Sequence, residues 1–158
     1  MAKSFLGQNA YPRGIRNNNP GNLRRSANAW VGKIPYSQST DASFEQFTHL
    51  HYGIRAMMRD IITDINRGNN TIAGLITEYA PPHENNTAAY IQNVVYATGI
   101  ASTSKLEVTD RLLISLGKAI AKMENGAIAE QLITDSDYQD AIDIIGVPIK
   151  KKAVTQPV

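Results

Sequence analysis

The central stretch of the chain, residues 52–65, reads YGIRAMMRDIITDI. Its large apolar residues recur at steps of three and four, the spacing that places side chains on one face of an α-helix. The polar run NRGNN at residues 66–70 then ends the pattern. We therefore predict an amphipathic helix here, within a helical pattern that begins at Phe44.

Four further helices are predicted after this one. Thr71 is placed to cap the next helix, and Pro81 ends it because the residue before a proline is disfavoured in the helical region. Gly99 and Gly126 supply the left-handed residue that commonly closes a helix. The fold class is therefore mainly α, with later helices over 72–79, 87–98, 109–125 and, as two short pieces, 128–145.

The front of the chain lacks helical periodicity. Residues 17–22 read NNNPGN, which is six consecutive turn formers. Residues 30–32 and 34–36 are candidates for the arms of a small hairpin, in which Pro35 restricts any strand to an edge. We expect an irregular or short-β lobe at this end of the molecule.

The length of 158 residues suits one compact domain and leaves no room for a second. We assign residues 1–146 to that domain, with an irregular basic front (1–42) and a helical body (43–146). Residues 147–158 have no periodic apolar face, so we expect a tail that packs little or docks on a partner.

Charge is distributed unevenly along the chain. Residues 1–40 hold six cations and no acid, residues 41–143 hold fourteen acids and seven cations, and residues 150–152 are three lysines. A front this basic suits nucleic acid, an anionic cell-wall polymer, or docking on an acidic body of the same or another chain. The small net charge of +2 favours docking within the chain. We do not expect nucleic acid as a partner, because the cations come without an aromatic stacking platform.

Several classes of chemistry are excluded by composition. The chain has no cysteine, which removes disulfide scaffolds, thiol nucleophiles and cysteine-ligated metals. With only three histidines we expect no metal site and no cofactor. No apolar run approaches the roughly 20 residues that span a bilayer, and the first residues lack the apolar core of a signal peptide. A role outside the cytoplasm would therefore require another means of delivery.

Two segments combine acids with polar groups that suit sugar binding. The stretch 81–87 (PPHENNT) contains Glu84, and the stretch 41–47 (DASFEQF) contains Asp41 and Glu45. Each acid also has an ordinary interpretation, as a helix cap or a first-turn carboxylate. Neutral amides and an aromatic face are what sugar recognition uses. Glycoside cleavage further requires one carboxylic acid that protonates the leaving oxygen.

The motifs together resemble a known family. Residues 13–24 (RGIRNNNPGNLR), the Trp30-x-Gly32 pair, the Asp41-x-x-Phe44-x-x-Phe47 spacing and residues 79–91 (YAPPHENNTAAYI) are similar to a family of phage and prophage virion proteins. That family is similar in turn to lysozyme-like lytic enzymes. The resemblance implies a lysozyme-like helical fold and cleavage of peptidoglycan strands by a muramidase or lytic transglycosylase. It also implies a virion-associated protein that reaches the host cell wall or periplasm during genome entry.

A more distant resemblance links the chain to flagellar glucosaminidases and soluble lytic transglycosylases. In those families the essential Glu ends a helix that precedes the Asn-containing segment, whereas this sequence has no acid before Asp41. Either a different carboxylate takes the acid role, or the protein is a non-catalytic virion structural or glycan-binding protein on a lysozyme-like scaffold.

The resemblance also implies roles for individual residues. Glu84 is the first candidate for the general acid, Asp41 for the second acidic residue, and Glu45 is the fallback. Tyr79 is expected to orient the acid or the sugar. The candidates for holding the glycan are Arg16, Asn17, Asn18, Asn22, Trp30, Asn85 and Asn86. Other virion proteins are possible partners of the basic front or the tail.

Overall fold

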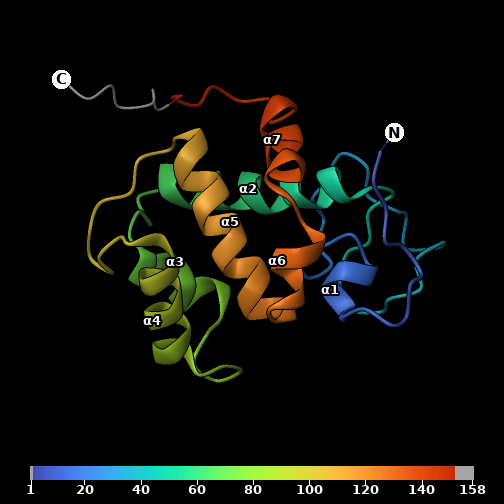
Figure 1. Ribbon diagram of the computed structural model, residues 1–158, viewed down its shortest axis with the longest axis horizontal. Helices are drawn as coiled ribbons and strands as arrows, with labels where there is room; N and C mark the ends of the chain where they lie inside the picture. Colours follow the sequence, from blue (N-terminus) through green and yellow to red (C-terminus); the bar gives the residue numbers. More distant parts are fainter. Residues whose placement is uncertain (1, 152–158) are drawn as a thin grey trace.

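The computed structural model describes residues 2–151, and helix α2 (Leu50–Asn66) runs through the centre of the molecule, behind α5 in the view of Figure 1. The predicted apolar stripe is its buried face: Ile54, Met57 and Met58 have no exposed surface. The helix begins at Leu50 and not near Phe44. Phe44 and Phe47 instead pair with Arg24 and Lys33 as isolated antiparallel bridges. Pairing with the front of the chain thus overrides the helical spacing in this segment.

The remaining helices agree with the sequence prediction. They are α3 (Ile72–Tyr79), α4 (Thr87–Thr98), α5 (Asp110–Asn125), α6 (Ile128–Leu132) and α7 (Asp135–Asp143). Four of them begin with a side-chain oxygen that accepts a backbone N–H bond, at Thr71, Asn86, Thr109 and Thr134. The mainly α fold class is confirmed.

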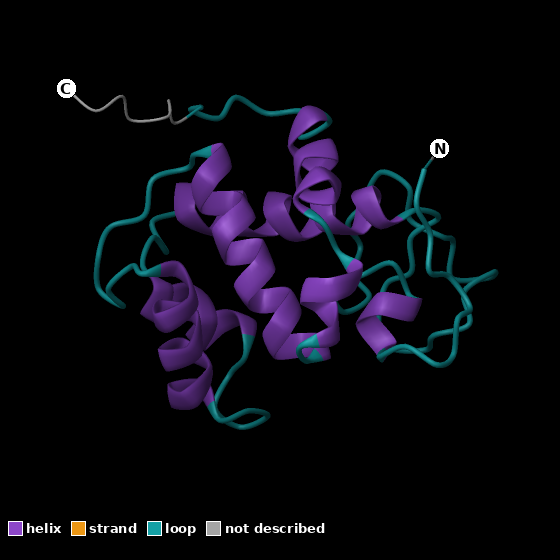
Figure 2. Cartoon of the chain, viewed as in Figure 1, coloured by secondary structure: helices purple, strands orange, loops and turns teal. Residues whose placement is uncertain are grey.

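Helix α5 lies at the middle of the helical body. It packs against α2, α4, α6 and α7, while α7 also crosses α2 and α3 pairs with α4 (Figures 1 and 2). Gly117 of α5 allows close packing, because a side chain there would lie 3.3 Å from the Tyr138 ring. One core of buried apolar side chains extends from Phe5 to Ile145 and joins the front to the helices.

The front is irregular apart from the short helix α1 (Arg13–Arg16), which the sequence did not predict. The predicted hairpin is replaced by the isolated bridges described above. Asn18 and Asn22 adopt left-handed backbone conformations, with φ of 54° and 49°, which asparagine tolerates better than most residues. The Asn18 carbonyl lies so close to Gly53 of α2 that a side chain at Gly53 would collide with it. Residues 17–22, which we call the asparagine segment, therefore pack directly against α2.

Most cations of the basic front contact acids of the same chain. The pairs are Lys3–Asp137 (2.7 Å), Arg13–Asp41 (2.7 Å), Arg24–Glu84 (3.4 Å) and Lys33–Glu45 (3.0 Å). This arrangement agrees with the expectation that the front docks within its own chain.

The described part of the predicted tail also contacts the chain itself. Lys150 forms a parallel bridge with Thr109, and its ammonium lies 2.8 Å from the Glu107 carboxylate. Val147 and Ile149 pack partly against the core. The expectation of little packing is therefore wrong for residues 147–150, and residues 152–158 lie outside the described part of the chain.

Across residues 2–151, none of the helices combines the length and apolar character needed to cross a bilayer.

Candidate functional site

A groove of about 240 Å³ separates the segment after the asparagine run from helices α2 and α3. It contains three residues that the sequence nominated, Asn22, Trp30 and Tyr79. The full lining is Asn22, Leu23, Arg24, Ser26, Asn28, Trp30, Asp60, Glu78 and Tyr79. Amides, two aromatic side chains and two carboxylates therefore meet here, on elements far apart in sequence.

Asp60 of α2 and Glu78 of α3 are groove acids that the sequence analysis missed. Burial, and then the nearby charges of Asp64 and Glu78, raise the pKa of Asp60 to about 6. Within the described part of the chain the structure gives Asp60 no hydrogen bond or ion pair. A carboxyl with this pKa can carry a proton near neutral pH. The sequence signal was available, because Asp60 lies beside the apolar stripe of its helix.

A further missed acid, Glu124, lies in the last turn of α5 and is not among the residues that line the groove. One carboxylate oxygen accepts a hydrogen bond from the Asn22 amide at 3.0 Å, and the other accepts one from the Tyr90 hydroxyl at 2.9 Å. The next residue, Asn125, donates its amide to the Pro20 carbonyl at 2.8 Å. This end of α5 is therefore joined to the asparagine segment, in agreement with its position beside α1 in Figure 1.

Tyr79 lines the groove together with Asp60, and its titration is affected by both Asp60 and Glu124. Its hydroxyl donates to the Gly21 carbonyl. Burial, followed by the charges of Glu124 and Asp60, raises the pKa of Tyr79 well above its usual value. Tyr79 therefore stays neutral, and both carboxylates are near enough to affect its titration.

Glu84, the first candidate from the sequence, lies at the rim of this site. Its half-exposed carboxylate pairs with Arg24, which lines the groove. Asn86 caps α4 and Asn85 donates to the Pro81 carbonyl at 3.4 Å, so both amides shape the loop before α4. Neither lines the groove.

Asp41 and Glu45 lie away from the groove and stabilise the front. Asp41 accepts two hydrogen bonds from Arg13, one from Asn17 and two from backbone N–H groups. The Arg13 contact is the main reason that the pKa of Asp41 lies far below its usual range. Glu45 is fully buried beside Lys33 and Tyr36.

The other predicted glycan-binding residues are also outside the groove. Asn17 and Asn18 are buried, and their amides bond Asp41 and the Phe47 carbonyl, respectively. Arg16 lines a separate hollow of about 270 Å³. Asn17 and Asp41 line the same hollow as Arg16. The structure thus brings the nominated residues together in two places: Asn22, Trp30, Tyr79 and, at the rim, Glu84 in the groove, and Arg16, Asn17 and Asp41 in the separate hollow.

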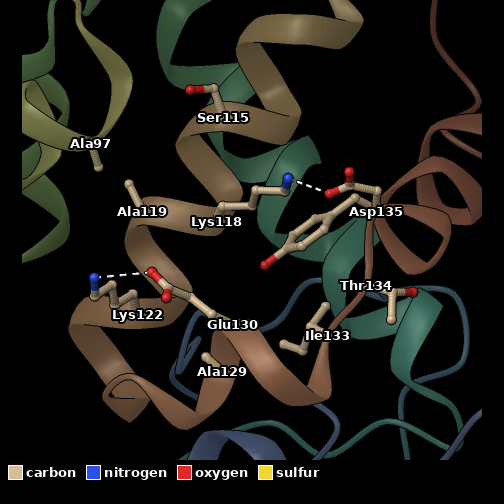
Figure 3. A pocket seen from close by; sticks show the side chains of 11 residues that line it. Ala97, Ser115, Lys118, Ala119, Lys122, Ala129, Glu130, Ile133, Thr134 and Asp135 are labelled. Carbon is tan, nitrogen blue, oxygen red and sulfur yellow. Dashed lines mark ion pairs between the residues drawn. The ribbon is translucent and has the colours of Figure 1, made fainter.

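A larger hollow of about 400 Å³ lies between α5, α6 and α7 (Figure 3). Two lysines on its α5 wall, Lys118 and Lys122, pair with Asp135 and Glu130, respectively. Each charge in this hollow therefore has an opposite partner, and it contains none of the nominated residues. Among residues 2–151 no group of three or more His, Asp or Glu side chains could hold a metal ion.

The sequence relationship defines the class of protein first: the chain belongs to a family of bacteriophage proteins. It is 36% identical over 123 residues to Protein P5 of Pseudoalteromonas phage PM2, and the match covers 75% of this chain and 74% of that relative. No family model matches the sequence. The phage origin expected from the sequence motifs is supported by this relationship.

Proposed function

We propose that this phage protein has a lysozyme-like fold and cleaves the glycan strands of peptidoglycan, with Glu124 as the proton-donating acid. The observation that carries the proposal is the set of contacts around Glu124. Asn22 of the asparagine segment and Tyr90 of α4 both donate hydrogen bonds to this one carboxylate, and its charge is one of the causes that raise the pKa of Tyr79. These are the motifs on which the resemblance to lytic enzymes rests.

We infer that Glu124 stands in for the missing upstream acid. In the glucosaminidases and lytic transglycosylases that the chain resembles, the essential Glu ends a helix before the Asn-containing segment. Here α5 follows that segment in the chain, yet the helix ends against it, and Glu124 lies one residue before the end of the helix. We infer that Glu124 can take the role of that acid, with the order along the chain changed.

The groove supplies the features that a glycan requires. Trp30 offers a flat apolar wall, and the exposed Asn28 offers an amide donor and acceptor. Asp60 is a second carboxyl, and its pKa of about 6 lets it donate a hydrogen bond to a sugar oxygen in mildly acidic conditions.

In the proposed reaction the Glu124 carboxyl transfers its proton to the glycosidic oxygen while the bond from that oxygen to the anomeric carbon breaks. Water completes the reaction in a hydrolase and leaves a reducing end. A hydroxyl of the same sugar completes it in a lytic transglycosylase and leaves an anhydro end. In both routes the deprotonated Glu124 receives a proton from the attacking group.

The test is digestion of purified sacculi by the wild-type protein and by Glu124→Gln. We expect Glu124→Gln to lose at least about 100-fold in released fragments, because loss of a general acid typically costs two to four orders of magnitude. Glu130→Gln is the matched control, since it neutralises an exposed carboxylate on the neighbouring helix α6. Mass spectrometry of the fragments distinguishes reducing from anhydro ends.

Retained activity in Glu124→Gln would overturn the assignment of the acid. Comparison with Glu84→Gln then shows whether the rim acid takes this role.

The second candidate function is a non-catalytic glycan-binding or structural protein of the virion. It is favoured by one observation: both oxygens of Glu124 already accept hydrogen bonds, as in a purely structural carboxylate. Sacculi that bind the protein yet stay intact from pH 4 to 9 would support this candidate. In either case we propose that the protein is carried in the virion and reaches the host cell wall during genome entry.

A further inference from the structure

The separate hollow that Arg16 lines, of about 270 Å³, shares no residue with the groove. We call it the Arg16 hollow. Every residue that lines it, apart from Gly7, has a polar or charged side chain. Its volume is just below the roughly 300–1,000 Å³ of pockets that hold drug-sized ligands. The hollow therefore suits a small and polar ligand group.

Arg16 is the cation of the basic front whose charge is not matched. Four of the six cations in residues 1–40 pair with acids, and Arg25 lies over the Tyr36 ring at 4.1 Å. In the part of the chain that the structure describes, Arg16 has neither an acid nor a ring as partner. Its guanidinium donates one long hydrogen bond, of 3.3 Å, to the Tyr11 carbonyl. Most of its five N–H donors therefore remain for a ligand.

Asp41 also lines the Arg16 hollow, but it does not neutralise Arg16. Both oxygens of Asp41 already accept hydrogen bonds from the Arg13 guanidinium, at 2.7 Å. The charge of Asp41 is thus matched by Arg13, and the hollow keeps the single positive charge of Arg16. A carboxylate balances one such charge, whereas a phosphate group carries close to two negative charges at neutral pH.

Neutral side chains hold the rest of the hollow in one arrangement. Asn17 and Gln46 are both buried, and the Gln46 amide donates to Asn17 at 2.9 Å and to Thr40 at 2.7 Å. Because the Thr40 oxygen accepts this bond, its own hydroxyl hydrogen remains for a ligand. The hollow thus offers donors on a wall that is already ordered, which lowers the entropic cost of binding.

We propose that the Arg16 hollow binds the carboxylate of a small ligand that also contains amides, with the Arg16 guanidinium as the main contact. A planar guanidinium matches a carboxylate through two parallel N–H bonds. The peptide stems on peptidoglycan strands carry free carboxylates next to amide bonds, and we assign the ligand to such a stem. This source of the carboxylate rests on the proposed function, whereas the carboxylate contact itself does not.

The first test is an NMR titration of the wild-type chain with N-acetyl-D-alanine. We expect saturable shifts of the backbone amides of Asn17, Thr40 and Gln46, with a dissociation constant of about 1–10 mM, since so small a ligand makes few contacts. N-acetyl-D-alaninamide, which lacks the charge, should cause no such shifts, and inorganic phosphate should bind at least tenfold more weakly. Equal shifts from the acid and its amide, or equal binding of phosphate, would overturn the proposal.

The second test replaces the guanidinium. Arg16→Gln should raise the dissociation constant for N-acetyl-D-alanine at least tenfold, because the charge-assisted hydrogen bonds are lost. Arg16→Lys keeps the charge without the fork, and we expect an increase of at least about threefold. The matched control is Arg111→Gln, which removes the same charge at an exposed position of α5 and should bind as the wild type does.

Circular dichroism should show that these variants are folded. Unchanged binding in both Arg16 variants, or an equal loss in Arg111→Gln, would contradict the assignment of Arg16.

Glu124→Gln separates this inference from the proposed function. It should bind N-acetyl-D-alanine as the wild type does, because Glu124 does not line the Arg16 hollow. A wild-type chain that digests sacculi but does not bind this acid would overturn the inference and leave the proposed function standing. A chain that binds the acid and leaves sacculi intact would support the carboxylate contact and count against the enzyme.

The assignment of the ligand to a peptide stem is tested with intact sacculi. Binding of Glu124→Gln to sacculi should fall when the stem carboxylates are converted to amides. It should fall to a similar extent when Arg16→Gln is added to the same chain. Binding that is insensitive to both changes would overturn this assignment.

Discussion

At the scale of single residues, two of the carboxyls that sequence analysis missed, Glu124 and Asp60, have opposite environments. Glu124 has two hydrogen-bond donors, Asn22 and Tyr90, on its two oxygens. Asp60 has none in the described chain and lies near the charges of Asp64 and Glu78. The first is held in one orientation, which suits a group that must meet a bond of the substrate. The second is destabilised when ionised, and this has a measurable consequence for folding.

Asp60→Asn should change how stability depends on pH. The pKa of Asp60 is about 6 in the folded protein and about 3.9 in an unfolded chain. The folded state therefore holds the Asp60 proton more tightly, and its contribution to stability is lost as pH rises from about 4 to 6. Asp60→Asn should remove this loss and stabilise the protein above pH 6 by about 1–2 kcal/mol, after allowance for solvent screening.

Urea unfolding of both proteins at pH 4, 5, 6 and 7 measures this difference. A constant gap between the two free energies of unfolding across these pH values would contradict the raised pKa.

At the scale of secondary-structure elements, the contact between α2 and the asparagine segment fixes one wall of the groove. Gly53 permits the contact, because it leaves room for the Asn18 carbonyl. The left-handed conformations at Asn18 and Asn22 then direct the segment toward Glu124. A glycine inside a helix normally weakens it by about 1 kcal/mol relative to alanine. Here the close approach outweighs helix propensity.

Gly53→Ala should therefore destabilise the protein, by at least about 3 kcal/mol, despite the better helix propensity of alanine. The new methyl group would collide with the Asn18 backbone, which is buried and cannot move freely. Gly117→Ala is the matched control within α5, because the atom nearest to the new methyl group would belong to a side-chain ring, at 3.3 Å. We expect this variant to change the free energy of unfolding by less than about 1.5 kcal/mol. Thermal unfolding followed by circular dichroism compares them, and similar stabilities for both variants would refute the packing argument.

At the scale of the whole molecule, the basic front is neutralised by the acidic body. The ion pairs formed by Lys3, Arg13, Arg24 and Lys33 engage much of the charge that could otherwise attract an anionic polymer. Three of the four acids, Glu45, Glu84 and Asp137, come from the body, and Asp41 comes from the front itself. This distribution explains how a chain with such separated charges forms one compact body.

The protein should accordingly show no measurable binding to single-stranded DNA at about 150 mM salt. Fluorescence anisotropy with a labelled oligonucleotide tests this. The contrary outcome is measurable binding. The logarithm of its association constant would fall linearly with the logarithm of the salt concentration, at a slope near −0.7 per phosphate contacted.

Local features of the molecule could be predicted from sequence, and long-range ones could not. The helix caps at Thr71 and Thr109 depend on neighbours three residues away, so the pattern was sufficient. Residues 44–47 have helical spacing but are extended, because the front of the chain pairs with them. Glu124 looked like an ordinary acid near the end of a helix. Only the folded chain brings it to Asn22, 102 positions away.

That separation has a consequence for synthesis of the protein. A nascent chain that has emerged only as far as residue 100 already contains the groove residues Asn22, Trp30 and Tyr79. It still lacks Glu124, the carboxyl that we propose as the proton donor. Lytic activity would then begin only after α5 leaves the ribosome and folds back against the first residues made. Translation products that end before residue 124 would lack the proposed acid.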